Sequence, residues 1–357
     1  MNTMKKFLHN PLFYKDFKSA RWISLILLLY LIKFKLLIFS PILNTIKSNI
    51  TNFTDISPGN MTPFKAEMAY WFKNNLLYSD QDMIVITIFV VILLIVLFKN
   101  ERNNSTYSFT ASMPFKREEI VKIKWIAGMF SISIPFFITF ILISIFYFKN
   151  TNWINDPYII VFQWFIINIL TFTAIFSFIF FIQTIMGQNI TASIIGALVL
   201  GIPGACIVMS IDFILSHYKN PIYPKDIPYI LEKVMIYFMS FPDYSIQKLG
   251  EYTTRVSYYK NFQIKIIILI LTCIVTYALS IYFFKRNSLE KTGFLIMFKP
   301  FEYILKFIVA IFLGLLMALI FGQSYAEDTL VVMYVSLTLG FLASYFITDK
   351  CIKYYSK

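Results

Sequence analysis

Residues 158–186 read YIIVFQWFIINILTFTAIFSFIFFIQTIM, a run without a single charged side chain. A helix needs roughly 20 apolar residues to cross about 30 Å of hydrocarbon, and this run is longer than that. We therefore expect the segment to be a membrane-spanning helix.

Further apolar runs of similar length fill most of the remaining chain. The composition is 58% hydrophobic and 14% charged, whereas an ordinary soluble domain has about 45–50% apolar and about 25% charged residues. The sequence therefore predicts an all-α polytopic membrane protein with eight transmembrane helices. Besides Tyr158–Met186, the predicted spans are Trp22–Leu43, Met83–Phe98, Trp125–Phe148, Ser193–Leu215, Ile264–Phe284, Tyr303–Gly322 and Leu330–Thr348.

The net charge of +13 is unevenly distributed along the chain. Segments 1–21, 99–124, 285–306 and 349–357 hold more than half of the 32 Lys and Arg residues but well under half of the 19 acidic ones. Basic segments of this kind stay on the cytoplasmic side of a membrane. The bias predicts that both termini are cytoplasmic, and it explains the charge without a nucleic-acid partner.

Three segments outside the spans carry structural signals of their own. Residues 1–21 are basic and aromatic, which suits either an interfacial amphipathic helix or a simple anchor of the first span. In the external loop 44–82, apolar residues recur at helical intervals over 68–76 and predict a surface helix. In the external loop 216–263, an apolar stretch too short to span predicts a re-entrant or interfacial helix.

The sequence offers little material for catalysis. Its three Cys and two His residues show no spacing typical of metal ligands. No G-x-x-x-x-G-K-[ST] motif is present to bind ATP phosphates. Glu118 and Glu119 resemble the paired glutamates of membrane-embedded CAAX-type proteases, but His9 and His217 are not placed in later spans, where that chemistry needs histidines. We expect no catalytic residue, no metal site and no cofactor in this chain.

Residues 100–125, NERNNSTYSFTASMPFKREEIVKIKW, form a polar segment between two apolar runs. Tyr107 pairs with Ala111, and Phe109 with Met113, at the i,i+4 spacing of a short helix, although the same alternation fits a strand. Pro114 ends that element, and a new helix follows it. An apolar side framed by charges is typical of a docking surface for a soluble partner.

Five residues of this segment carry a resemblance to a known family. Glu101, Thr106, Pro114, Arg117 and Lys124 have the spacing found in ABC-2-type permeases, the type V exporter fold. In that family the segment between spans two and three contains a coupling helix that binds in a cleft of the ATP-binding subunit. The resemblance implies the same role for 99–124.

The resemblance covers roughly residues 1–293, and the lengths of the loops in this range also agree with those of the family. A weaker match, Arg286, Glu290 and Gly293, is similar to a pattern of Gram-positive members. The family usually has Gly where Ser105 stands, and its minimal members have six spans. The implied organisation is an elbow helix at 1–21, a six-span core at 22–284, a cytoplasmic connector at 285–302 and two additional spans at 303–348.

The resemblance implies the permease subunit of an ATP-driven exporter in the plasma membrane of a Gram-positive bacterium. ATP and Mg would be bound by a separate ATPase subunit, and a second permease copy, identical or a sibling, would complete the transporter. Because the pathway offers few polar groups, the expected cargo is hydrophobic or amphipathic, with peptides before lipid-like molecules. A non-transporting membrane immunity or sensor partner is the alternative, and an intramembrane enzyme is disfavoured. The residues expected to bind the ATPase are Glu101, Tyr107, Phe109, Met113, Pro114 and Arg117.

Two further sets of residues lie inside the predicted spans. Lys33 and Lys35 are two residues apart and point in nearly opposite directions on a helix. Either both lysines extend to the membrane surface, or one does so while the other faces a central pathway or meets Asp212 near the outer end of the fifth span. Gly201, Pro203 and Gly204 weaken a helix ladder, which suits either a hinge or close helix packing.

Overall fold

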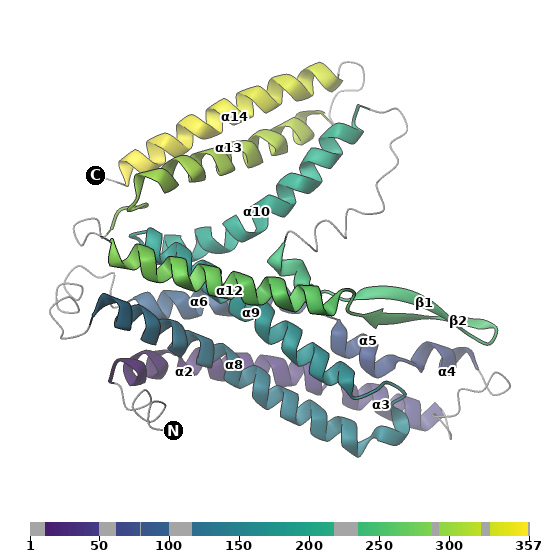
Figure 1. The fold of residues 1–357 in the computed structure, drawn as a ribbon. Coiled ribbons are helices and arrows are strands. Elements are labelled where there is room, and N and C mark those ends of the chain that lie inside the picture. Colours follow the sequence, from purple (N-terminus) through teal and green to yellow (C-terminus); the bar gives the residue numbers. More distant parts are fainter. Residues whose placement is uncertain are drawn as a thin grey trace. The chain divides into compact units, whose positions relative to one another are not determined.

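The computed structural model describes residues 11–49, 62–78, 80–99, 116–217, 235–287, 293–322 and 329–355. In this part of the chain almost every element is a helix, and one β-hairpin accompanies them (Figure 1). The elements are α2 (Pro11–Leu31), η1 (Ile32–Leu36), α3 (Phe39–Asn49), α4 (Pro63–Met68), α5 (Trp71–Leu77), α6 (Asp80–Phe98), α8 (Arg117–Lys149), η3 (Thr151–Trp153), α9 (Ile159–Ile185), α10 (Asn189–Leu215), η4 (Ile236–Ser240), β1 (Asp243–Leu249), β2 (Tyr252–Tyr258), α12 (Phe262–Lys285), α13 (Lys299–Gly322) and α14 (Thr329–Tyr354).

Within these ranges, eight helices are long and apolar enough to cross a membrane. Each coincides with one of the predicted apolar runs, so the architecture is that of an all-α polytopic membrane protein. The helical segments are Pro11–Asn49, Trp71–Phe98, Arg117–Lys149, Ile159–Ile185, Asn189–Leu215, Phe262–Arg286, Lys299–Gly322 and Leu330–Tyr354.

The basic segment before the first span is not a separate element where the structure describes it. Residues 11–21 belong to α2, which continues without a break to Leu31. Pro11 lies at the first helical position, where its missing N–H costs nothing, and no Gly or Pro follows to end the helix at residue 21. Buried residues recur along one face of α2 every three or four positions: Leu12, Phe13, Asp16, Ala20, Ser24, Leu27 and Leu31.

A π-helical turn, η1, follows α2. Its wider hydrogen bond runs from the N–H of Leu37 to the carbonyl oxygen of Ile32 at 3.0 Å. A turn of this type adds one residue to the helix and changes the direction of the side chains. In η1, Lys35 is buried and Lys33 is exposed.

The described chain divides into two compact units. Unit 1 combines Met1–Leu93, Ile123–Phe176 and Met239–Cys273, and unit 2 combines Leu94–Lys122, Ser177–Phe238 and Ile274–Lys357.

In unit 1 the predicted surface helix near 68–76 is two short helices, α4 and α5. Pro63 is the first residue of α4, and the Thr62 side chain caps the helix by accepting the Lys65 N–H at 3.2 Å. α5 buries Trp71, Phe72 and Leu76.

The β-hairpin is the main feature of unit 1 that the helical interpretation of residues 216–263 did not predict. β1 and β2 pair in antiparallel fashion, with Asp243 opposite Tyr258 and Leu249 opposite Tyr252. The turn is only Gly250 and Glu251, and Gly250 has a φ of 65°, which glycine adopts without steric cost. Before the hairpin lies η4, a short 3-10 helix, and residues 218–234, which hold most of the stretch expected to form a re-entrant or interfacial helix, lie outside the described residues.

In unit 2, α13 and α14 lie side by side along their length (Figure 1). The buried face of α13 carries Lys306, Ala310, Gly314, Ala318 and Gly322, which recur every four residues. Small residues at this spacing let two helix backbones approach closely. At one end of the pair, Lys306 and Asp349 form an ion pair at 2.5 Å.

Candidate functional site

The predicted coupling segment lies between α6 and α8, and only its last part is described. Arg117 is the first residue of α8, and Lys116 immediately precedes it. The other predicted ATPase-binding residues lie outside the described residues: Glu101, Tyr107, Phe109, Met113 and Pro114.

The start of α8 is joined to the end of α12 by two side chains. Arg117 donates a hydrogen bond from Nη1 to the carbonyl oxygen of Asn287 at 2.8 Å. The carboxylate of Glu118 forms an ion pair with Lys285. Glu119 reaches back to accept the backbone N–H of Lys116 at 3.2 Å, as in a capping box. The first turn of α8 is therefore fixed to the end of α12 by Arg117 and Glu118, and it is capped by Glu119.

Asn287 connects the end of α12 to the end of α9. Its side chain is 3% exposed, and its amide nitrogen lies 3.5 Å from the carbonyl oxygen of Thr184. Among the described residues its Oδ1 atom has no hydrogen-bond partner. A buried carbonyl of this kind ordinarily accepts a donor from water or from a neighbouring segment.

The segment after residue 293 pairs with the turn between α9 and α10. The Gly187 N–H donates to the Phe294 carbonyl oxygen at 2.9 Å, and the Met297 N–H donates to Ile185 at 3.0 Å. Gly293 has a φ of 101°, a conformation that favours glycine. The predicted tight turn between the fourth and fifth spans therefore forms a small ladder with the connector.

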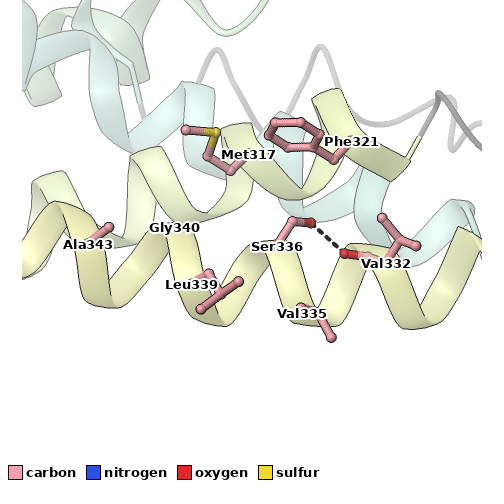
Figure 2. Close-up of a pocket in the computed structure, with 8 residues that line it drawn as sticks. All are labelled: Met317, Phe321, Val332, Val335, Ser336, Leu339, Gly340 and Ala343. Atoms are coloured by element: carbon pink, nitrogen blue, oxygen red, sulfur yellow. Dashed lines mark hydrogen bonds between the residues drawn. The ribbon is translucent and has the colours of Figure 1, made fainter.

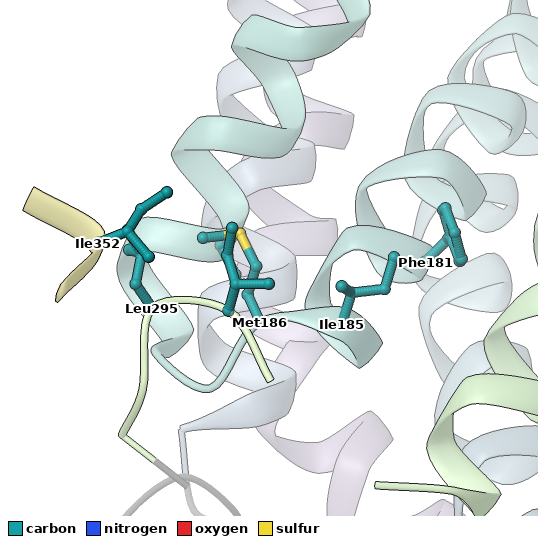
Figure 3. Close-up of a cluster of buried hydrophobic side chains, with 7 residues drawn as sticks. Phe181, Ile185, Met186, Leu295 and Ile352 are labelled. Carbon is teal, nitrogen blue, oxygen red and sulfur yellow. The ribbon is translucent and has the colours of Figure 1, made fainter. Parts of the chain in front are cut away.

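The same segments contribute side chains to an apolar cluster (Figure 3). It joins α9, α10, the connector and the last turn of α14 through buried side chains. We call residues 116–119, 181–193, 285–287 and 293–297 the platform. The cluster consists of Phe181, Ile185, Met186, Ala192, Leu295, Ile296 and Ile352.

Lys35 forms a buried ion pair in unit 1. Its Nζ atom lies 2.6 Å from Oδ2 of Asp82, and it also donates to the carbonyl oxygens of Leu76 and Tyr78. The other carboxylate oxygen of Asp82 accepts the Tyr30 hydroxyl at 2.8 Å. These acceptors, among the described residues, suit the N–H donors of an ammonium group, so this lysine connects η1 to α5 and α6.

The other predicted intramembrane charges have different surroundings. Lys33 is exposed, and its ammonium lies 5.1 Å from the centre of the Phe34 ring. Asp212 belongs to unit 2, in the last turn of α10. The partner of Lys35 is Asp82, which sequence analysis did not single out because no local spacing relates the two positions.

A second buried ion pair in unit 1 joins α2 to α8. Nζ of Lys124 lies 3.3 Å from Oδ2 of Asp16, and only 2% of the Lys124 side chain is exposed. Lys124 matched the family spacing, whereas Asp16 gave no signal beyond its place on the buried face of α2.

The predicted hinge residues of α10 lie against residues 235–237, which also belong to unit 2. α10 continues through Pro203 as one helix. A Cβ atom added at Gly204 would overlap the thioether of Met235, and one at Gly201 would lie 3.7 Å from the Tyr237 ring. The Tyr237 hydroxyl donates to the Ala197 carbonyl oxygen at 2.8 Å. The small residues therefore let residues 235–237 pack closely on the middle of α10.

An open apolar cavity of about 380 Å³ lies between α13 and α14 (Figure 2). Its only hydroxyl, on Ser336, donates to the Val332 carbonyl oxygen at 2.6 Å in its own helix. The lining therefore offers apolar contacts alone. It consists of Met317, Phe321, Val332, Val335, Ser336, Leu339, Gly340 and Ala343.

Comparisons with family models, curated proteins and solved structures return no match for this chain. Within the described ranges no group of three His, Cys, Asp or Glu side chains is arranged to hold a metal ion. The platform is the place where the structure describes part of segment 99–124, to which the sequence resemblance assigns the coupling role.

Proposed function

We propose that this chain is the membrane-spanning permease subunit of an ATP-driven exporter of the ABC-2 type. One observation carries the proposal: the first turn of α8, where the polar segment between α6 and α8 ends, is fixed to the end of α12 by Arg117 and Glu118. A partner that moves the polar segment would therefore act on two membrane helices together.

The contacts around Asn287 extend this connection. Arg117 binds the backbone of Asn287, and the Asn287 side chain approaches the last turn of α9. α8 is itself 33 residues long, or about 50 Å at 1.5 Å per residue. A push on the polar segment is thus transmitted through a rigid helix and through the platform. This is the property that a coupling segment requires.

The partners, the cargo and the location are those that the family resemblance implies. A separate ATPase subunit binds ATP and Mg and docks on residues 99–124, and a second permease copy, identical or a sibling, completes the assembly. The cargo is hydrophobic or amphipathic, with peptides as the first class to test. The location is the plasma membrane of a Gram-positive bacterium, with both termini in the cytoplasm.

The test uses the full chain in proteoliposomes with a candidate ATP-binding cassette subunit from the same genome. We expect the two to co-purify, and we expect ATP hydrolysis to depend on the permease. Arg117→Ala reduces this dependence in complexes that retain the ATPase, because the first turn of α8 loses its hydrogen bond to Asn287. Lys122→Ala is the matched control, since Lys122 is exposed on the next turn of the same helix.

Two outcomes would count against the exporter. Failure of any ATPase to bind the chain would remove the basis of the proposal. Stable binding with hydrolysis unaffected by the permease, in the wild type and in Arg117→Ala alike, would favour a non-transporting immunity or sensor partner.

A further inference from the structure

Three hydrogen bonds hold α5 and the turn before it against the segment that connects α8 to α9. The Trp71 indole N–H donates to the Trp153 carbonyl oxygen at 2.9 Å. The Lys73 backbone N–H donates to Oδ2 of Asp156 at 2.9 Å, and the Asn155 amide donates to the Ala69 carbonyl oxygen at 3.2 Å. We call this interface, formed by residues 69–73 and 153–156 of unit 1, the α5 latch.

Asp156 is the only carboxylate in the α5 latch, and it is 3% exposed. Among the described residues its side chain accepts one hydrogen bond and forms no ion pair. The titratable groups that face it are Lys73 from α5, Tyr70 from the turn before α5 and Tyr147 from α8. The Tyr147 hydroxyl donates to the backbone carbonyl oxygen of Asp156 at 2.7 Å rather than to its carboxylate.

Burial therefore disfavours the ionised form of this side chain. Loss of solvent raises the pKa of Asp156 from 3.8 to about 6, although the N–H bond and the charge of Lys73 both act in the opposite direction. A folded state that raises the pKa of an acid binds its proton more tightly than the unfolded state does. The stabilisation is complete below about pH 4 and is lost as the pH rises through about 6.

We propose that the α5 latch is a pH-responsive device, closed most firmly when Asp156 carries a proton and opened more often when it is ionised. The device responds to the compartment that this end of unit 1 faces. It does not depend on the exporter function, because it requires only the contacts between α5 and the 153–156 segment.

Hydrogen exchange of the α5 amides in the full chain, in lipid nanodiscs, tests the proposal. After correction for intrinsic exchange, wild-type protection of Trp71–Leu77 falls about tenfold between pH 5 and pH 7.5. Asp156→Asn keeps a carbonyl acceptor for the Lys73 N–H but does not titrate. Its α5 protection is therefore independent of pH and exceeds that of the wild type at pH 7.5.

Asp243→Asn is the matched control. Asp243 also accepts a backbone N–H in unit 1, that of Lys260 at 3.3 Å, but its side chain is only partly buried. This variant keeps the wild-type pH profile in α5. The proposal fails if the wild-type profile is flat between pH 5 and pH 7.5, a result that needs no variant. It also fails if Asp156→Asn retains the wild-type slope or if Asp243→Asn abolishes it.

Discussion

Lys35 and Asp82 form an ion pair at 2.6 Å in which the lysine side chain is 5% exposed and the carboxylate 13%. Removing one member of a buried pair leaves the other charge without compensation, at a cost of about 3–5 kcal/mol. We expect Asp82→Ala to lower the free energy of unfolding by this amount in detergent. Lys33→Met is the control, because the Lys33 side chain is exposed, and a loss as large as that of Asp82→Ala would contradict the assignment.

Replacing both members of the pair gives a second prediction. The double variant Lys35→Met, Asp82→Leu removes both charges and fills the space with apolar groups, so neither a buried ammonium nor a buried carboxylate is left alone. We expect its thermal unfolding to lie closer to the wild type than that of Asp82→Ala. A double variant less stable than the single one would show that the two residues act independently.

The glycines of α10 provide a matched pair of substitutions. Gly204→Ala forces the thioether of Met235 to move, and overpacking of this kind costs about 1–3 kcal/mol. Gly201→Ala meets the Tyr237 ring at an ordinary contact distance of 3.7 Å and gains roughly 0.5–1 kcal/mol of helix propensity. Thermal unfolding of the two variants should shift in opposite directions. Met235→Ala should restore stability to Gly204→Ala, and no rescue would indicate that Met235 is not the obstacle.

The Asn74 side chain hydrogen-bonds to the backbone of β2 along the edge that does not pair with β1. Its amide donates to the Arg255 carbonyl oxygen at 2.7 Å and accepts the Ser257 N–H at 2.8 Å. We expect Asn74→Ala to cost about 1–2 kcal/mol and to accelerate hydrogen exchange at Ser257. Asn75→Ala removes a bond that stays within α5, to the Trp71 carbonyl oxygen, and should leave exchange in β2 unchanged.

The close approach of α13 and α14 depends on Gly314. A Cβ atom at this position would lie 3.3 Å from the Leu337 carbonyl oxygen and from the Phe341 backbone nitrogen, which cannot move aside as a side chain can. We expect Gly314→Ile to separate the helices and to make α14 sensitive to added protease. Ile311→Val, at an exposed position one turn earlier, should leave the digestion pattern of α14 unchanged.

The spans were predictable because a helix that crosses a membrane needs an apolar side chain at almost every position, and such runs are visible in the sequence. Each apolar run from Trp22–Leu43 to Leu330–Thr348 corresponds to a helix. The hairpin also left a signal, since Gly250 and Glu251 separate two stretches rich in Tyr, Thr, Ile and Val. The expectation of a helix in this loop rested instead on the apolar stretch just before the hairpin, which is too short to span a membrane.

The pairing of charges was not predictable from the sequence. Lys35 and Lys124 each stood out as a cation at a span or at its edge, but Asp82 and Asp16 lie on other helices, and their identity as partners depends on how those helices pack. The π-helical turn adds to the difficulty, because it turns Lys35 inward at a place where an ideal helix pattern gives no reason to prefer it over Lys33.

Pro11–Asn49 is a single helical segment of 39 residues, or about 58 Å, nearly twice the thickness of a hydrocarbon layer. Asp16 and Lys35 are about 28 Å apart along this segment, so the two ion pairs hold it at widely separated points. The first helical segment is therefore fixed to other helices of unit 1 at both of these points. A tilt imposed at one of them must displace the other.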